Sequence, residues 1–305
     1  MPSNRRITLN VPQHFNLRST IFSHGWCSLL PFRVQAEPLE LRWMQRLADG
    51  TLVGIAVKGK DATDGAVILH TTSNAPLKRA HTAEIQFLAR DVFQLSLDLA
   101  PFHARARRIA GYRWIARMGA GRLLRAPDIF EDVVKMILTT NCTWTLTELM
   151  NTRLVEALGD AGPGNARAFP LPSAIAACDE TFLRASCTLG YRAPYVLEFA
   201  RACADGRLAL DSLRRSEAPS EEIYKTLRSI KGVGEYAASN LLRLLGRFDR
   251  LGLDSWCRAT YARLHANGAA TDEDIHMFYD RFGEYRGLAM WMDLTKEWYH
   301  DKFPI

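Results

Sequence analysis

The 305-residue chain lacks the cysteine patterns that build metal clusters. Six cysteines are present, and none forms a Cys-x-x-Cys pair, so the usual zinc spacings are absent. No closely spaced quartet suited to an iron–sulfur cluster occurs either. A signal-peptide pattern is also missing. We therefore expect reduced thiols, a cytoplasmic location and no metal centre.

The sequence has no apolar run long enough to span a bilayer, which predicts that membranes are not among its partners. Internal repeats and low-complexity tracts are absent too. What is present is an ordinary globular composition, 48% apolar and 24% charged, with enough residues for two domains. The net charge of +6 is compatible with a polyanionic partner but does not establish one.

Two structural classes divide the chain. Residues 1 to about 85 are mostly β in character, with β-branched runs at 51–57 and 66–70 and a hairpin turn at Asp49-Gly50. From about residue 83 the periodicity is helical, apart from a Gly/Pro-rich loop at 159–172. The helices that we predict span 83–98, 128–140, 144–158, 192–205, 219–229, 234–246, 255–266, 271–282 and 285–298. The predicted fold is α+β, with an antiparallel β domain over 1–100 packed on a helical domain over 101–305.

Seven arginines fall between Pro101 and Pro127 with no acidic residue among them. They are Arg105, Arg107, Arg108, Arg113, Arg117, Arg122 and Arg125. One interpretation is a phosphate-facing surface. The other is a solvated helix face, which is the usual fate of such runs. The sequence leaves both open.

The most informative stretch is I-K-G-V-G-E-Y-A-A at 230–238, which predicts a tight hairpin between two helices within 219–246. Gly232 and Gly234 can adopt backbone angles closed to other residues and let another chain segment approach. The hairpin amides and the start of the next helix suit a phosphate. Asp254 follows twenty residues after Gly234, so a carboxylate lies just beyond a candidate phosphate-binding site.

Three further segments strengthen this pattern, and with them the chain resembles the helix-hairpin-helix DNA glycosylases of the 3-methyladenine and 8-oxoguanine branch. F-E-D-V-V-K-M-I-L-T-T-N at 130–141 resembles the helix before the intercalating loop of that family. L-G-Y-R-A-P-Y-V at 189–196 is similar to a family segment. Residues 15–32, with His24-Gly25-Trp26, resemble the opening strand region of the β domain.

The resemblance implies excision of a damaged base that is flipped out of double-stranded DNA, in base excision repair. Asp254 would be the catalytic carboxylate, since cleaving an N-glycosidic bond builds positive charge on the sugar. An N-cap role for the helix from Ser255 is the alternative, and both can hold. Gly232, Val233 and Gly234 would bind DNA. Asn141, Tyr191 and Arg192 would fill the vacated space, wedge beside the orphaned base and contact that base.

One position departs from the bifunctional members of the family, which carry a lysine two residues after the second hairpin glycine. This chain has Tyr236 there, and a phenol cannot form an imine with the sugar. Lys231 precedes the glycines and is a poor substitute. We therefore predict a monofunctional enzyme that uses water, as in the 3-methyladenine branch.

A second departure follows Asn141. The 8-oxoguanine enzymes carry an arginine shortly after this position, and none follows here.

Tyr236, Trp256 and Asn240 are the predicted substrate-binding residues. Trp144 is either a stacking surface or a buried aromatic at a helix start. Trp256, Trp291 and Trp298 either line a pocket or pack in the core, and core packing is the default for each. The predicted substrates are alkylated or otherwise electron-poor purines, excised without an organic cofactor by a monomer. The resemblance allows an alkali-metal ion at the hairpin. The alternatives are an 8-oxoguanine glycosylase without lyase activity and a lesion-binding protein that does not cleave.

Overall fold

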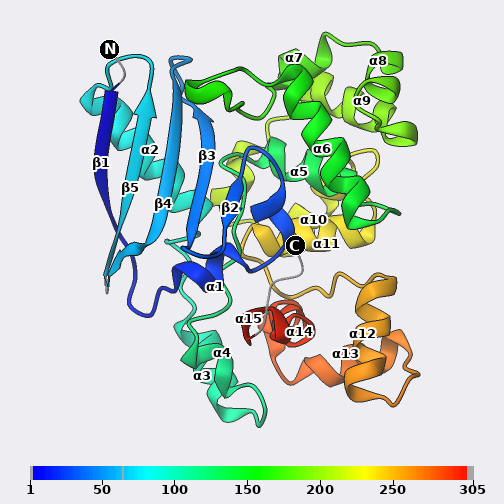
Figure 1. The fold of residues 1–305 in the computed structure, drawn as a ribbon. Helices are drawn as coiled ribbons and strands as arrows, with labels where there is room; N and C mark the ends of the chain where they lie inside the picture. The colour runs from blue at the N-terminus through cyan, green and yellow to red at the C-terminus, as the bar shows by residue number, and fades with distance from the viewer. Residues whose placement is uncertain (1–2, 64, 301–305) are drawn as a thin grey trace.

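The computed structural model describes residues 3–63 and 65–300. Its first part is a five-stranded antiparallel sheet in the order β1-β5-β4-β3-β2 (Figure 1). The strands are β1 (Ser3–Asn10), β2 (Arg33–Gln35), β3 (Glu40–Arg46), β4 (Leu52–Thr63) and β5 (Ala66–Ser73). The predicted β-runs coincide with β4 and β5, except that β4 begins at Leu52 rather than Thr51, and the turn predicted at Asp49-Gly50 joins β3 to β4.

One face of the sheet is covered by α2 (Arg79–Val92), which lies behind the strands in Figure 1. Ile85, Ala89 and Val92 are buried at helical spacing on the inner side of α2. Burial alternates along β4, since Ile55 and Val57 are buried while Ala56 between them is not.

Helices form most of the chain after β5, and the α+β fold class predicted from the sequence is confirmed. They are α3 (Ala100–Arg108), α4 (Arg113–Arg117), α5 (Ile129–Leu138), α6 (Trp144–Leu158), α7 (Pro172–Ala176), α8 (Glu180–Ala185), α9 (Ala193–Ala204), α10 (Ser220–Arg228), α11 (Glu235–Leu244), α12 (Ser255–His265), α13 (Asp272–Asp280), α14 (Arg286–Leu294) and α15 (Lys296–His300). No helix among the described residues is long and apolar enough to cross a membrane. One buried apolar cluster runs from the sheet to α14, and the domain boundary at residue 100 stays a prediction.

Several local predictions were wrong. Residues 15–32 contain no strand, because α1 (Leu17–Ile21) and a 3-10 helix (Gly25–Ser28) occupy most of this segment. The helix predicted over 83–98 ends at Val92, and the one predicted over 285–298 is divided at Thr295. The helices α3, α4, α7 and α8 were missed. The last three have only five or six residues, and so few turns carry little periodicity.

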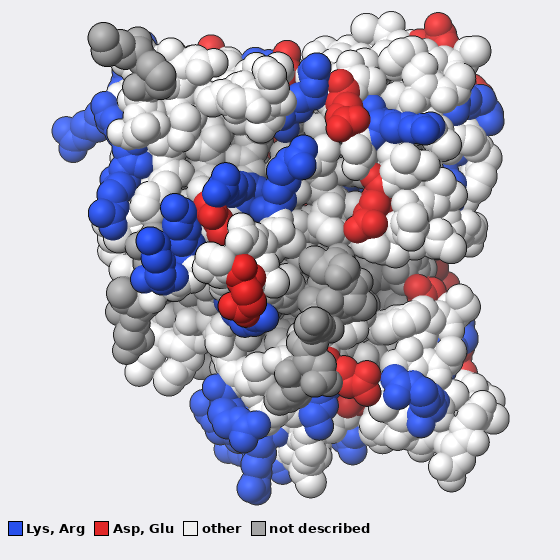
Figure 2. Space-filling model, in the orientation of Figure 1, with Lys and Arg blue, Asp and Glu red and all other residues white. Residues whose placement is uncertain are grey.

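The arginine run is divided by the fold. Its first five members are exposed on α3 and α4, where Figure 2 shows Lys and Arg gathered at the bottom of the molecule. Arg122 and Arg125 are buried, so neither the phosphate-facing nor the solvated interpretation holds for them. Arg122 donates to the Gln94 carbonyl, and Arg125 donates to the Asp91 carbonyl. For these two residues, internal carbonyl oxygens take the place of water or phosphate.

Candidate active site

The hairpin predicted from the sequence joins α10 to α11. Gly232 has φ +88°, and a Cβ there would lie 2.9 Å from the Tyr195 ring, so both its backbone and its surroundings require glycine. Gly234 differs from the prediction, because its φ of −77° is open to any residue. It caps α11, and the nearest atom to an added Cβ is on Arg228 at 3.9 Å. The conformational argument therefore applies to Gly232 alone.

Asp254 is the N-cap of α12. Its Oδ1 accepts a hydrogen bond of 2.7 Å from the Cys257 amide, as the capping interpretation expects. The same side chain lines a cavity of about 430 Å³, so capping leaves the carboxylate facing an open volume. Capping also fixes the side-chain rotamer, which holds the carboxylate in one position.

The cavity gathers residues from distant parts of the chain. Besides Asp254, its lining includes Tyr236, Asn240 and Trp256, all predicted to bind substrate. The remaining lining residues are His24, Gly25, Trp26, Leu123, Met136, Thr139, Cys142, Trp144, Thr147, Arg243, Leu244, Trp291 and Trp298. The structure thus brings the predicted catalytic and substrate-binding residues together in one site.

Three indoles form one wall of the cavity. Trp256, Trp291 and Trp298 contact one another with ring centroids 5.7 to 6.0 Å apart. Trp291 also donates its indole N–H to the Ser23 carbonyl at 2.8 Å. All three line the cavity, as the pocket interpretation expects, and Trp291 also packs against the buried apolar cluster. An extruded base would meet aromatic surface here.

Another part of the cavity lining comes from the segment expected to be a strand. His24, Gly25 and Trp26 line the cavity, and the His24 ring lies 4.9 Å from the Trp26 ring. Burial lowers the pKa of His24 to about 4, so its imidazole is neutral and donates to the Leu124 carbonyl. The His-Gly-Trp sequence was the available signal, but nothing in it indicated a cavity.

Gly25 explains the position of Trp144. A Cβ on Gly25 would lie 2.2 Å from the Trp144 ring, so only glycine admits this indole. Trp144 begins α6 and donates to Glu148 at 2.9 Å. It is half-buried and lines the cavity, so both interpretations drawn from the sequence describe part of its environment.

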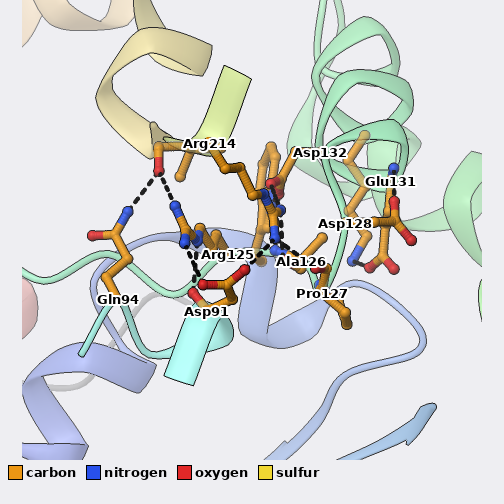
Figure 3. A network of polar contacts seen from close by, with 12 residues as sticks. Asp91, Gln94, Arg125, Ala126, Pro127, Asp128, Glu131, Asp132 and Arg214 are labelled. Carbon is orange, nitrogen blue, oxygen red and sulfur yellow. Dashed lines mark hydrogen bonds and ion pairs between the residues drawn. The ribbon is translucent and has the colours of Figure 1, made fainter. Parts of the chain in front are cut away.

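A buried polar network holds Trp26, one of the cavity-lining residues, in place (Figure 3). Asp132, in α5, accepts from the Trp26 indole at 2.8 Å and from the Arg214 guanidinium at 2.9 Å. Arg214 also donates to the carbonyls of Ala126 and Pro127. Asp91, on α2, pairs with Arg125 in the same network. Trp26 is therefore held by buried, charge-assisted hydrogen bonds.

Arg243 is a site residue that the sequence reasoning missed. It is 3% exposed, lines the cavity and lies with its guanidinium 5.4 Å from the Trp291 ring centroid. Its Nη1 donates to the Asn240 side-chain oxygen at 2.7 Å. In sequence it is one more residue of an apolar-periodic helix, where an arginine ordinarily faces solvent. No local pattern distinguishes it.

Tyr236 lines the cavity with Asp254 and Arg243 and interacts electrostatically with both. Burial raises the pKa of its phenol well above the usual range, and the charge of Asp254, with a hydrogen bond to it, adds to the effect. The phenol is therefore neutral at physiological pH. Lys231 lies elsewhere, in an exposed ion pair of 2.9 Å with Glu198.

A second group of predicted residues, two exposed and one buried, lies around the Thr140 carbonyl. Asn141 is exposed with φ +47°, in the left-handed region. The Tyr191 hydroxyl donates to the Thr140 carbonyl at 3.1 Å, and Arg192 donates to the same oxygen. Tyr191 is 45% exposed, whereas Arg192 is 4% exposed and stacks on the Tyr191 ring. We call Asn141, Tyr191 and Arg192 the Asn141 edge; their contacts with DNA stay predictions.

The hairpin carbonyls do not fit an alkali-metal ion well. The Val233 carbonyl already accepts from the Arg228 guanidinium at 3.0 Å, which brings a positive charge to this oxygen. The Ile230 carbonyl accepts from the Val233 amide at 3.0 Å. A cation at these carbonyl oxygens would compete with both hydrogen bonds and would lie beside the Arg228 guanidinium.

Comparison with known proteins finds one curated sequence relative and solved structures of the same fold. No protein-family model matches the chain. It is 25% identical over 227 residues, 67% of this chain and 70% of the relative, to a "Probable N-glycosylase/DNA lyase" of Methanothermobacter thermautotrophicus. The solved 3-methyladenine DNA glycosylase of Archaeoglobus fulgidus matches with a TM-score of 0.74 and 20% identity, covering 97% of this chain and 99% of that one.

A second solved structure is the Clostridium acetobutylicum 8-oxoguanine glycosylase/lyase in complex with double-stranded DNA. It matches with a TM-score of 0.72 and 17% identity and covers 98% of both chains. The family resemblance drawn from the sequence is thus confirmed by comparisons over nearly the whole chain. The protein has the fold of the helix-hairpin-helix DNA glycosylases.

Proposed function

We propose that the protein is a DNA glycosylase that hydrolyses the N-glycosidic bond of a damaged base in base excision repair. The observation that carries this proposal is the position of Asp254, fixed as an N-cap and facing an aromatic-walled cavity. A carboxylate held there would stabilise the oxocarbenium-like sugar as the bond breaks. It would also orient or deprotonate the attacking water.

DNA would meet two surfaces beside the cavity. The hairpin at Gly232–Gly234 presents backbone amides at the start of α11, which suit a phosphate. The Asn141 edge offers an exposed amide and an exposed aromatic ring, which suit the gap left by the extruded nucleotide. We infer a monomer that binds double-stranded DNA containing a damaged base and acts in the cytoplasm, in agreement with six free cysteine thiols.

We further propose that the enzyme is monofunctional, although the curated relative is named a glycosylase and lyase. Tyr236 stands at the position where the bifunctional members have lysine. None of the described residues that line the cavity is a lysine, and Lys231 is paired outside it. Water is then the nucleophile. Borohydride should trap no covalent enzyme–DNA adduct during excision, and a trapped adduct would refute the assignment.

The substrates proposed from the sequence are alkylated or otherwise electron-poor purines, which are good leaving groups. The indoles of Trp256, Trp291 and Trp298 support this, because aromatic faces stack well on electron-poor rings. A second candidate, an 8-oxoguanine glycosylase without lyase activity, is favoured by Asn141 and Tyr191. Duplexes that each carry one defined lesion would separate these from a protein that binds without excision.

A further inference from the structure

Arg243 carries hydrogen-bonding capacity that the protein itself does not use. Its Nη1 is held by Asn240, but Nε and Nη2 are buried and have no hydrogen-bond partner within the part of the chain that the structure describes. Asn240 is in turn fixed, since its amide nitrogen donates to the Tyr236 carbonyl at 2.8 Å. The guanidinium is thus oriented from one side and unsatisfied on the other.

Such an arrangement is costly in a folded protein. Buried donors without partners lose their hydration and gain nothing in return. Burial accordingly lowers the pKa of Arg243, while Asp254 and Tyr236 act in the opposite direction. An acceptor supplied by a ligand in the cavity would remove this cost. The guanidinium presents a planar fork, which suits carbonyl oxygens and ring nitrogens of a base.

We propose that Arg243 is a specificity-determining residue that donates hydrogen bonds to acceptor atoms of the extruded base. This inference rests on the proposed glycosylase function and narrows its substrate class. Among electron-poor purines, the favoured bases are neutral and carry a carbonyl oxygen or ring nitrogen on the edge facing Arg243. Purines with a fixed positive charge, such as those alkylated at N7, are disfavoured by repulsion from the guanidinium.

The charges of the cavity support this selection. Among the described lining residues, Asp254 and Arg243 are the two that carry charge, because His24 is neutral through burial. Arg243 also lies against the face of Trp291, at 5.4 Å from the ring centroid. The cation–π contact that an alkylated, cationic base would seek at this indole is therefore already made by the protein.

Single-turnover excision by the whole protein tests the proposal on duplexes containing hypoxanthine, 8-oxoguanine or N7-methylguanine. Wild type should excise at least one of the neutral bases faster than N7-methylguanine. Arg243→Met should lower excision of that neutral base by about 10- to 100-fold, as expected for a lost hydrogen bond to a charged group. Excision of N7-methylguanine should stay within a few-fold or rise. Arg243→Lys should keep the repulsion and lose most of the acceptor recognition.

Arg247→Met is the matched control, since Arg247 donates to the Ser216 carbonyl and does not line the cavity. Thermal unfolding and binding to a duplex with a tetrahydrofuran abasic site, which has no base to read, verify that the variants fold. An equal loss on all bases, no loss on any, or a wild type that prefers N7-methylguanine would overturn the assignment of Arg243. A wild type that excises nothing from any duplex would instead overturn the proposed function.

Discussion

The cavity and the Asn141 edge were both predicted from the same resemblance, yet they are built differently. In the cavity, Asp254 and Arg243 are fixed by the protein, one as a helix cap and one through Asn240. At the edge, Tyr191 and Arg192 also donate to one carbonyl oxygen, that of Thr140, but Asn141 and Tyr191 remain exposed. Chemistry on a base requires oriented groups in an enclosed site, whereas filling a gap in DNA requires exposed side chains.

The largest effect should come from the cavity carboxylate. Asp254→Asn keeps an N-cap of similar strength, so the variant should unfold at nearly the wild-type temperature. Excision should fall by about 10²–10⁴-fold, because the charge that stabilises the sugar cation is removed. Single-turnover excision and duplex binding measure the two effects separately. Retained excision would remove Asp254 from the chemistry and leave it a cap alone.

The next effect concerns the neutral imidazole in the cavity wall. The pKa of His24 is lowered from 6.5 to about 4 in the folded state, so between these values only the unfolded chain gains the proton. The stabilising contribution is complete above pH 6.5 and is lost as pH falls towards 4, by about 3 kcal/mol in total. His24→Gln should abolish this part of the pH dependence in denaturant titrations. An unchanged slope would show that other groups cause it.

A smaller effect distinguishes the two hairpin glycines. Gly232→Ala should lower the free energy of unfolding by about 1–3 kcal/mol, because φ is +88° and the new Cβ meets the Tyr195 ring. Gly234→Ala should cost about 1 kcal/mol or less, since its φ is ordinary and only the cap preference changes. Denaturant unfolding of both variants provides the comparison. Equal losses would contradict the assignment of strain to Gly232.

Among the effects on DNA, the smallest should come from the Asn141 edge. Tyr191→Ala removes an exposed ring, so duplex binding should weaken by about 1–2 kcal/mol with little change in stability. Asn141→Gly should accept the left-handed backbone while removing only the amide. Fluorescence anisotropy with lesion-containing duplexes measures both. If either variant lost excision with unchanged binding, the edge would share in the chemistry, and the contrast with the cavity would fail.

Much of the architecture was predictable because its signals are local. The hairpin around Gly232 follows from glycine chemistry, and the long helices follow from apolar periodicity. The segment containing His24 was misassigned as strand, since its short helical turns carry no period of their own. Gly234 was assigned a special backbone from its residue type alone, and its observed φ corrects this.

The candidate site was predictable only in part. The sequence spacing identified Asp254 and Tyr236, and the structure brings them to one cavity. Arg243 could not be found, because whether an arginine on a helix faces water or a buried cavity depends on the elements packed around it. Arg122 and Arg125 show the same ambiguity within a run that looked uniformly exposed.

By itself, the sequence determined the α+β division, the tight hairpin, the carboxylate after it and the absence of lysine at Tyr236. These depend on residue chemistry and on neighbours close along the chain. Tertiary structure alone decided that His24, Trp144, Arg243 and Trp291 would meet around Asp254. They come from segments as far apart as α14 and the residues before β2. The cavity is enclosed only when the whole chain packs. Because of this enclosure, the Arg243 guanidinium is buried with donors that have no partner among the described residues.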